Sequence, residues 1–431
     1  MDSTRLSKGR VAAWALYDFA NSPYSTIMTT VGFPLVFTQI VAPGRSGPLL
    51  WGLLYGVSQV AAGVLAPGLG AWSDGVGRRR PFLVAFALTA IGGTALCALV
   101  GPGDLWMAVF FFGLANMGFA CANVFYNALL VEVAPREKRD TVSGIGWGTG
   151  YIGGLLALVL CEPLYRDGVA AGTLGKVHAS FLVVAGIFLL FSLPIFFLRE
   201  RSGPAPGGAK GLGEAYARVW RTLKEIRRYA NLFHYLLANF FFNDGIHAVI
   251  LFASVFGTKA LGLEAHKIYL LFIALQIVGA AGAFAAGWLA DRVGSRRMLL
   301  ILVGSWAVLV GTMASVQTFA GFAAAGAGAG LLLGATQSVA RGFLSKIAPK
   351  EQEGEFFGFF GLCGKFSSFI GPVIFGGVSS LTGNMRLGAL SLVPLFLVGF
   401  FLLLKVEDPS KKPDGGERGN GETEVQKDEA N

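Results

Sequence analysis

Two short stretches of this chain share one pattern, and that pattern sets the organisation of the whole sequence. The stretch Gly70–Arg80 reads GAWSDGVGRRR, and the stretch Gly287–Arg297 reads GWLADRVGSRR. Each one follows an apolar run, and the acidic residues Asp74 and Asp291 are 217 positions apart. A glycine, an aspartate and a basic cluster that return in the same order indicate an internal repeat.

Two further matches extend the repeat along the chain. Tyr17–Asn21 aligns with Tyr235–Asn239 at an offset of 218, and Ala134–Glu137 aligns with Ala348–Glu351 at an offset of 214. The nearly constant offset predicts two homologous halves. An offset that covers six apolar segments also predicts that both halves cross a membrane in the same direction.

The composition is that of a membrane protein. Hydrophobic residues make up 54% of the chain and charged residues only 14%, whereas soluble domains carry about 25% charged residues. We count twelve apolar segments, most of them near the roughly 20 residues that cross ~30 Å of hydrocarbon. The segments are 12–40, 49–72, 81–101, 105–132, 141–163, 178–198, 231–257, 268–290, 298–317, 320–345, 355–380 and 386–404. The sequence therefore predicts an all-α membrane protein and excludes a large soluble α/β enzyme.

The apolar segments divide the chain into four parts. We predict a first six-helix bundle over 1–198, a cytoplasmic linker over 199–230, a second six-helix bundle over 231–405 and a disordered cytoplasmic tail over 406–431. The linker opens with the flexible stretch Ser202–Gly208. Apolar residues then recur at helical spacing among basic ones, namely Leu212, Tyr216, Val219, Trp220, Leu223 and Ile226. Such an amphipathic basic helix is suited to lie on anionic membrane lipid; calmodulin-type binding is the alternative.

The net charge of +9 does not indicate a nucleic-acid partner, because the basic residues lie in short loops between apolar runs. By our count, 27 Lys and Arg residues lie on one side of the predicted topology and 6 on the other. This imbalance predicts that both termini are cytoplasmic. The first apolar run shows no small-residue cleavage site and is predicted to be a retained first helix. A compact chain rich in Ala, Gly and Arg looks bacterial, which predicts the inner cell membrane.

The loop spacing of Gly70, Asp74, Gly77, Arg78 and Arg79 resembles the signature of the major facilitator superfamily. The opening stretch Trp14–Tyr24, together with Asn243–Gly245, resembles the vacuole-effluxer-like branch, whose fungal members are autophagy-related permeases implicated in amino-acid export. The resemblance implies two six-helix bundles related by a pseudo-twofold axis. It also implies a secondary transporter that moves a small polar solute by alternating access, with export of amino acids as the activity that the fungal members suggest.

In that superfamily, helices one, four, seven and ten line the central cavity, and here these helices carry most of the deep polar residues. We predict a substrate and ion pathway formed by Asp18, Asn21, Asn123, Asn127, Asn239, Asn243, Asp244, His247, Gln337 and Arg341. Ionisable groups inside a membrane usually face a cavity. The alternatives are that the amides only hold helices together, that Asp18 bonds a helix end, and that Arg341 belongs to a cytoplasmic gate. For Lys365 the alternatives are pairing with a carboxylate and extension to the membrane surface.

The repeated loop motif also predicts gates. Asp74 is placed to cap the N-terminus of a neighbouring helix, where the helix dipole favours an anion. In the superfamily this contact holds the cytoplasmic side shut. We therefore assign gating to the two loops and list their residues as Gly70, Asp74, Gly77, Arg78 and Arg79 in the first and Asp291 and Arg297 in the second.

A coupling ion completes the predicted mechanism. We favour the proton, with Asp18, Asp244 and His247 as candidate carriers, because burial raises a carboxylate pKa and His titrates near neutral pH. Sodium is the competing ion, since Asp18, Asn21 and Ser22 offer it several oxygen ligands.

The sequence contains no phosphate-binding loop and no catalytic triad pattern, so we expect neither an enzyme nor an ATP-driven pump. The four cysteines form no Cys-x-x-Cys pair, and we expect no metal site and no cofactor. We expect a monomer. The alternative functions are a lipid or drug exporter, a scramblase and a non-transporting membrane receptor. An ion channel is disfavoured because it would not need the repeated gating loops.

Overall fold

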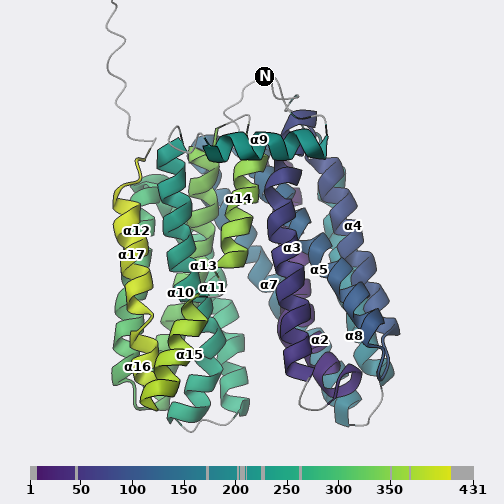
Figure 1. Ribbon diagram of the computed structural model, residues 1–431, viewed down its shortest axis with the longest axis vertical. Helices are drawn as coiled ribbons and strands as arrows, with labels where there is room; N and C mark the ends of the chain where they lie inside the picture. The colour runs from purple at the N-terminus through teal and green to yellow at the C-terminus, as the bar shows by residue number, and fades with distance from the viewer. Residues whose placement is uncertain are drawn as a thin grey trace, which may run out of the picture.

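The computed structural model consists of helices and the turns between them, in the residues that it describes. These are residues 7–43, 47–170, 174–200, 203, 209, 211–224, 229–261, 265–349, 352–367 and 370–408. Figure 1 shows two bundles of long helices side by side, with the short helix α9 lying across one end of both. We call this end the α9 end. The tail residues 409–431, predicted to be disordered, lie outside the described residues.

The first bundle follows the six apolar segments predicted for it. Its elements are α1 (Lys8–Pro23), η1 (Tyr24–Val31), α2 (Gly32–Val36), η2 (Phe37–Val41), α3 (Gly47–Val76), α4 (Arg80–Leu96), η3 (Cys97–Leu99), α5 (Leu105–Ala128), α6 (Leu130–Val133), η4 (Arg136–Lys138), α7 (Arg139–Ala170) and α8 (Leu174–Phe196). The first segment changes from α-helix to the wider π-helix directly after Pro23. Proline lacks the backbone N–H that an α-helix needs at this position, so a change of helix type here has a physical cause.

The linker and the second bundle also follow the predicted segments. Their elements are α9 (Leu212–Lys224), α10 (Ala230–Leu261), α11 (Ala265–Val293), α12 (Ser295–Thr312), η6 (Met313–Ser315), α13 (Phe319–Ile347), α14 (Glu353–Phe366), α15 (Ile370–Thr382), α16 (Met385–Leu390) and α17 (Val393–Leu404). One departure matters for the site. The predicted segment 355–380 is not one uninterrupted helix, because α14 ends at Phe366 and α15 begins at Ile370.

Among the described residues, 11 helices are long and apolar enough to cross a membrane. They correspond to the predicted segments from 49–72 onward. The first predicted segment, 12–40, is not among these 11 helices. Its elements α1, η1, α2 and η2 nevertheless follow one another without a gap. The structure thus has the all-helical, multi-pass character that the sequence predicts.

Each half of the chain has its own hydrophobic core. The first core draws its buried residues from Val11 to Leu198. The second draws them from Ala209 to Val406, with a small contribution from α3 and α5. Small residues bring helices close together within a bundle: Gly93 of α4 and Gly118 of α5 have no room for a Cβ atom against the facing helix. This is the packing that the high glycine content indicates for membrane helices.

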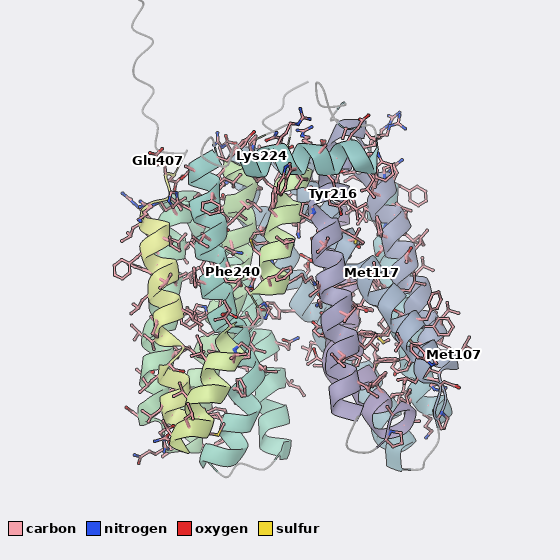
Figure 2. All side chains as sticks on the ribbon, viewed as in Figure 1. Met107, Met117, Tyr216, Lys224, Phe240 and Glu407 are labelled. Atoms are coloured by element: carbon pink, nitrogen blue, oxygen red, sulfur yellow. The ribbon has the colours of Figure 1, made fainter. Side chains whose placement is uncertain are left out.

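Helix α9 uses its apolar face to dock onto protein. Ala215 and Val219 are buried, and the hydroxyl of Tyr216 donates a hydrogen bond to the carbonyl of Val64 at 3.0 Å. The Tyr216 ring covers Gly68 of α3. Figure 2 shows Tyr216 at the α3 end of α9 and Lys224 at the opposite end of the helix. The interpretation of the apolar face as a membrane contact therefore changes for Tyr216 and Val219, which pack on the bundle.

Leu212 and Trp220 of the same face are exposed, with 37% and 60% of their surface accessible. The Lys224 ammonium lies 5.7 Å from the ring centre of Trp220. The side chain of Leu223 and all of Ile226, which the sequence also assigned to the apolar face, lie outside the described part of the chain.

Candidate substrate pathway and gates

Asp74 caps the N-terminus of a helix in the opposite half. Its Oδ1 accepts a hydrogen bond from the N–H of Gly354 at 3.1 Å, and its Oδ2 accepts one from the N–H of Glu355 at 3.0 Å. Both donors belong to the first turn of α14, where unpaired N–H groups and the helix dipole favour an anion. Gly70, one turn earlier on α3, touches the Gly354 backbone and has no room for a Cβ atom. The two halves are thus in backbone contact at the α9 end.

Asp291 makes the corresponding cap in the other direction. It accepts hydrogen bonds from the N–H groups of Asp140 at 3.3 Å and Thr141 at 2.7 Å, in the first turn of α7. Residues 140 and 141 correspond to Gly354 and Glu355 at the repeat offset of 214. The two caps are therefore related by the same repeat as the loops that carry them.

The cations that surround the two caps are not related by the repeat. Beside Asp74, the buried Arg79 binds Asp74 Oδ1 at 2.9 Å and Glu353 Oε2 at 2.7 Å. Burial by itself would lower the pKa of Arg79, but these two carboxylates outweigh it and raise that pKa above its ordinary value. Arg79 therefore stays charged and ties the end of α3 to the start of α14.

Beside Asp291, the cation comes from a different element. The ammonium of Lys346, on α13, lies 2.6 Å from Asp140 Oδ2 and 2.8 Å from Asp291 Oδ1. Ser295 also donates a hydrogen bond to Asp140. Because Lys346 joins α13 to α7, it links the two halves much as Arg79 does at the other cap.

Four other residues of the gating loops make no cap: two are glycines that end helices, and two are exposed arginines. Gly77 and Gly294 have φ angles of 71° and 99°, a left-handed conformation that glycine adopts readily and that ends a helix. Arg78 and Arg297 are exposed and make no hydrogen bond or ion pair with any residue that the structure describes. The structure thus gives no contact across the halves to these two arginines.

Arg341 forms a buried polar link between the halves. From α13 it reaches into the first bundle, where Nη1 lies 2.9 Å from Asp18 Oδ2 and 3.4 Å from Asn127 Oδ1. Its Nε donates to the Ser143 hydroxyl at 2.9 Å and its Nη2 donates to the Ser143 carbonyl at 2.8 Å. With 4% of its surface exposed, Arg341 is almost fully enclosed.

Aromatic rings complete the surroundings of this guanidinium. Its central carbon lies 4.7 Å from the ring centre of Trp14, 5.5 Å from that of Tyr126 and 5.6 Å from that of Trp147. Arginine is attracted to aromatic faces and is less strongly hydrated than lysine, which makes it suited to such an enclosed site. Ser143, Trp14 and Trp147 are not among the pathway residues predicted from the sequence, although Trp14 lies one turn before Asp18 on the same helix.

The predicted amides pair within each half. Asn21 donates to Asn123 at 3.3 Å in the first bundle, and Gln337 donates to Asn243 at 2.7 Å in the second. The repeat offsets relate Asn123 to Gln337, so the two amide pairs occupy related places. Asn239 accepts a further hydrogen bond from Asn243 at 2.9 Å.

Asp244 lies at the interruption between α14 and α15. Its carboxylate is fully buried, and Oδ2 accepts a hydrogen bond from the N–H of Gly371 at 2.7 Å, in the first turn of α15. The predicted proton-sharing pair with His247 is absent from the described contacts, because Asp244 faces the start of α15 instead. His247 itself makes no hydrogen bond to a described residue.

Lys365 follows neither of the two alternatives that the sequence left open. It lies in the last turn of α14 and is partly exposed. In the described part of the chain it pairs with no carboxylate, and its position in the middle of a membrane segment keeps it from the membrane surface. Within the same part of the chain, no group of three or more His, Cys, Asp or Glu residues is arranged to hold a metal ion.

Comparison with known proteins identifies the family. A family model described as "Vacuole effluxer Atg22 like" matches residues 52–416. The chain belongs to the Atg22-like vacuole effluxer family. This Atg22-like chain is 28% identical over 412 residues to the uncharacterised MFS-type transporter YxiO of Bacillus subtilis, which covers 92% of this chain and 94% of that relative. It is also 28% identical over 228 residues to autophagy-related protein 22 of Cryptococcus neoformans, covering 47% of this chain and 42% of that protein.

Solved structures confirm the major facilitator fold for the Atg22-like chain. The transporter FucP in the outward conformation matches with a TM-score of 0.73 at 14% identity, over 93% of this chain and 98% of FucP. The proton:xylose symporter XylE, bound to 6-bromo-6-deoxy-D-glucose, matches with a TM-score of 0.72 at 14% identity, over 93% and 96% of the two chains. The family and the fold are those of transporters and not of enzymes.

Proposed function

We propose that this protein is a secondary active transporter that moves a small polar solute across the cell membrane by alternating access. The observation that carries the proposal is the pair of repeat-related caps at the α9 end, Asp74 on α14 and Asp291 on α7. Each cap joins one half to the other by hydrogen bonds from N–H groups to a carboxylate. Contacts of this kind are modest individually, so they suit an interface that must open and close in each cycle.

The positions of the contacts between halves favour a state that is closed at the α9 end. Close approaches between α3 and α14 run from Gly70 to Pro67, and those between α7 and α11 run from Gly144 to Gly148. In both helix pairs they occupy the part nearer to α9. Figure 1 agrees, since the ribbons of the two halves converge toward α9 and separate toward the opposite end. We infer that solute enters this state from the side opposite to α9.

The charge distribution supports a cytoplasmic location for the α9 end. In the proposed topology, the basic loops and both termini lie at this end and together hold 27 of the Lys and Arg residues. In a bacterial cell this topology corresponds to the inner membrane. The observed state would then be open toward the outside and closed toward the cytoplasm.

We propose the proton as the coupling ion and Asp18 as its principal carrier. Asp18 is the acid that links the halves through Arg341, and its side chain keeps 13% exposure. Protonation would remove the negative charge that Arg341 binds and would loosen a contact between α1 and α13. Sodium binding fits less well because the positive guanidinium of Arg341 already lies 2.9 Å from Asp18 Oδ2 and would repel a second cation there. Asp244 already accepts a hydrogen bond from the start of α15, which makes it a less suitable proton carrier than Asp18.

The paired amides support a polar solute. Asn21 with Asn123, and Asn243 with Gln337, present hydrogen-bonding groups from both halves at similar depth. The fungal relatives suggest amino acids moved outward as the first solutes to examine.

The test is solute-driven proton movement in vesicles. Purified protein is reconstituted into liposomes that contain a pH-sensitive dye, and amino acids, sugars and organic acids are added outside one at a time. We expect at least one solute to change the internal pH in wild-type vesicles and not in Asp18→Asn vesicles. Uptake that needs sodium and ignores the pH gradient would reject proton coupling. The absence of any solute flux would reject transport itself.

A further inference from the structure

Lys365 is a positive charge placed deep in the membrane region. It lies twelve residues after Glu353, the first residue of α14. At 1.5 Å per residue this depth is about 18 Å, just beyond the middle of a hydrocarbon layer of ~30 Å. A lysine this deep cannot extend its ammonium to either membrane surface, although lysines near helix ends commonly do so.

Three cations join the halves through carboxylate partners. Arg79 binds Asp74 and Glu353, Arg341 binds Asp18, and Lys346 binds Asp140 and Asp291. Lys365 differs from them, because within the described ranges it makes no hydrogen bond and no ion pair. An unpaired cation at this depth raises the free energy of the folded protein in the membrane, and residues of this kind are usually functional.

Among the residues that the structure describes, those that face Lys365 from neighbouring helices carry no negative charge. A Cβ atom built on Gly63 of α3 would lie 3.5 Å from the Lys365 Cβ, so the start of the side chain rests on α3. Cys121 of α5 and His247 of α10 are close enough to interact with Lys365 electrostatically. The C-terminal dipole of α14 favours a cation in its last turn, but this effect is weaker than the cost of removing an ammonium from water.

The two acids on helices α1 and α10 are already engaged. Asp18 binds Arg341, and Asp244 caps α15 through Oδ2, while its Oδ1 is enclosed and accepts no hydrogen bond from a described residue. The groups left for a solute are therefore the Lys365 charge and the neutral amides. A ligand with one negative charge would balance this set, whereas the ammonium group of an amino acid would find on these two helices one carboxylate held by Arg341 and one that is fully buried.

We propose that Lys365 binds the carboxylate of the transported solute, and that this solute is a small organic monocarboxylate. The inference rests on the transport function proposed above and narrows its substrate class. An ammonium recognises an anion as a compact point charge, and the partial exposure of Lys365 leaves it accessible to a ligand. The amide pairs would then hold the hydroxyl or carbonyl groups of the solute.

The first experiment measures ligand binding by thermal shift on the full-length protein in detergent. The probes are L-lactate and pyruvate as monocarboxylates, L-alanine as a zwitterion and D-xylose as a neutral solute. A ligand that binds only the folded state raises the apparent Tm. We expect lactate or pyruvate to raise the Tm of wild type, and we expect Lys365→Met to weaken that binding at least roughly tenfold, while Lys365→Arg retains part of it. The matched control is Lys224→Met, at the exposed end of α9, which should bind like wild type.

The apo protein supplies a second readout. If Lys365 is an unpaired buried charge, Lys365→Met removes an unfavourable group and should raise the Tm without ligand. A lysine with a structural partner would give the opposite result. A lower apo Tm for Lys365→Met, no shift of wild type with either monocarboxylate, or equal monocarboxylate binding by Lys365→Met would each overturn the proposal.

Vesicle flux separates this proposal from the transport function. Transport of alanine or xylose at the same rate by wild type and Lys365→Met would reject the role of Lys365 and leave the transporter intact. Monocarboxylate binding that depends on Lys365, without flux of any solute in wild-type vesicles, would reject transport and retain the binding site.

Discussion

Replacing Asp74 by asparagine should open the α9 end without unfolding the protein. The carboxylate accepts hydrogen bonds from two N–H groups of α14 and an ion pair from Arg79. An amide keeps one acceptor oxygen, so Asp74→Asn loses one of the two bonds to α14 together with the negative charge. The change acts on a contact between the halves and leaves the core of each half intact.

The size of the effect can be worked out from these contacts. A hydrogen bond to a charged group contributes about 1.5–3 kcal/mol, and an anion at a helix N-terminus contributes about 0.3–1 kcal/mol. The two terms overlap, so we take about 2 kcal/mol as the destabilisation of the closed state. This energy changes a two-state ratio roughly 30-fold. A population that is closed in about 99% of molecules would become closed in about three quarters.

Distances between spin labels measure this population. Arg78 and Arg297 are exposed, lie in opposite halves at the α9 end, and have no described partner that a label would disturb. We propose Arg78→Cys with Arg297→Cys in a variant whose four native cysteines are replaced, measured by double electron–electron resonance. We expect one distance in the parent protein and a second, longer distance when Asp74→Asn is added.

The control is the same chemical change at the opposite end of the molecule. Asp104 accepts a hydrogen bond from the N–H of Gly101 at 2.9 Å within a short turn of the first half. Asp104→Asn should leave the label distances unchanged. A distance distribution for Asp74→Asn that overlays that of the parent protein would show that the cap does not hold the α9 end shut.

Three further predictions concern topology, the central arginine and α9. Reporter fusions after Ser202 and after Lys412 should both score cytoplasmic, and a periplasmic result at either position would reject the topology. Arg341→Lys keeps the charge but cannot reproduce the four polar contacts of the guanidinium, so the initial rate of solute flux in vesicles should fall at least about tenfold; an unchanged rate would remove Arg341 from the transport cycle. Arg218 binds the buried Glu355 at 3.3 Å, so Arg218→Ala should speed amide hydrogen exchange in α9 selectively, whereas uniform exchange across the protein would indicate general unfolding.

The helical fold could be predicted from the sequence because membrane segments follow from local composition. An apolar run of about 20 residues satisfies its backbone hydrogen bonds internally by forming a helix, whatever its neighbours are. The repeat of the two loops then gives the relation between the halves without any structure. The capping tendency of Asp74 also follows from the sequence, since the residue type and its position at the end of an apolar run are both local.

The partners of the polar residues could not be predicted in the same way. Which helix Asp74 caps is a matter of tertiary packing, because Gly354 is 280 positions away. The interruption between α14 and α15 has local signals, because Ser367 and Pro372 lie within the run 355–380. Its partner has none, because the N–H of Gly371 at the start of α15 donates to Asp244 of another helix, 127 positions away.

The sequence by itself determined a two-part helical membrane protein with repeated gating loops and polar residues on helices one, four, seven and ten. The tertiary structure decided how those residues are used. It enclosed Arg341 against Asp18, 323 positions away, it assigned Asp244 to a helix end, and it left Lys365 without a described counter-ion. The physical reason is that hydropathy and charge can be read from each residue and its neighbours in the chain. Hydrogen bonds and ion pairs form only where helix packing brings two polar atoms within about 3 Å of each other.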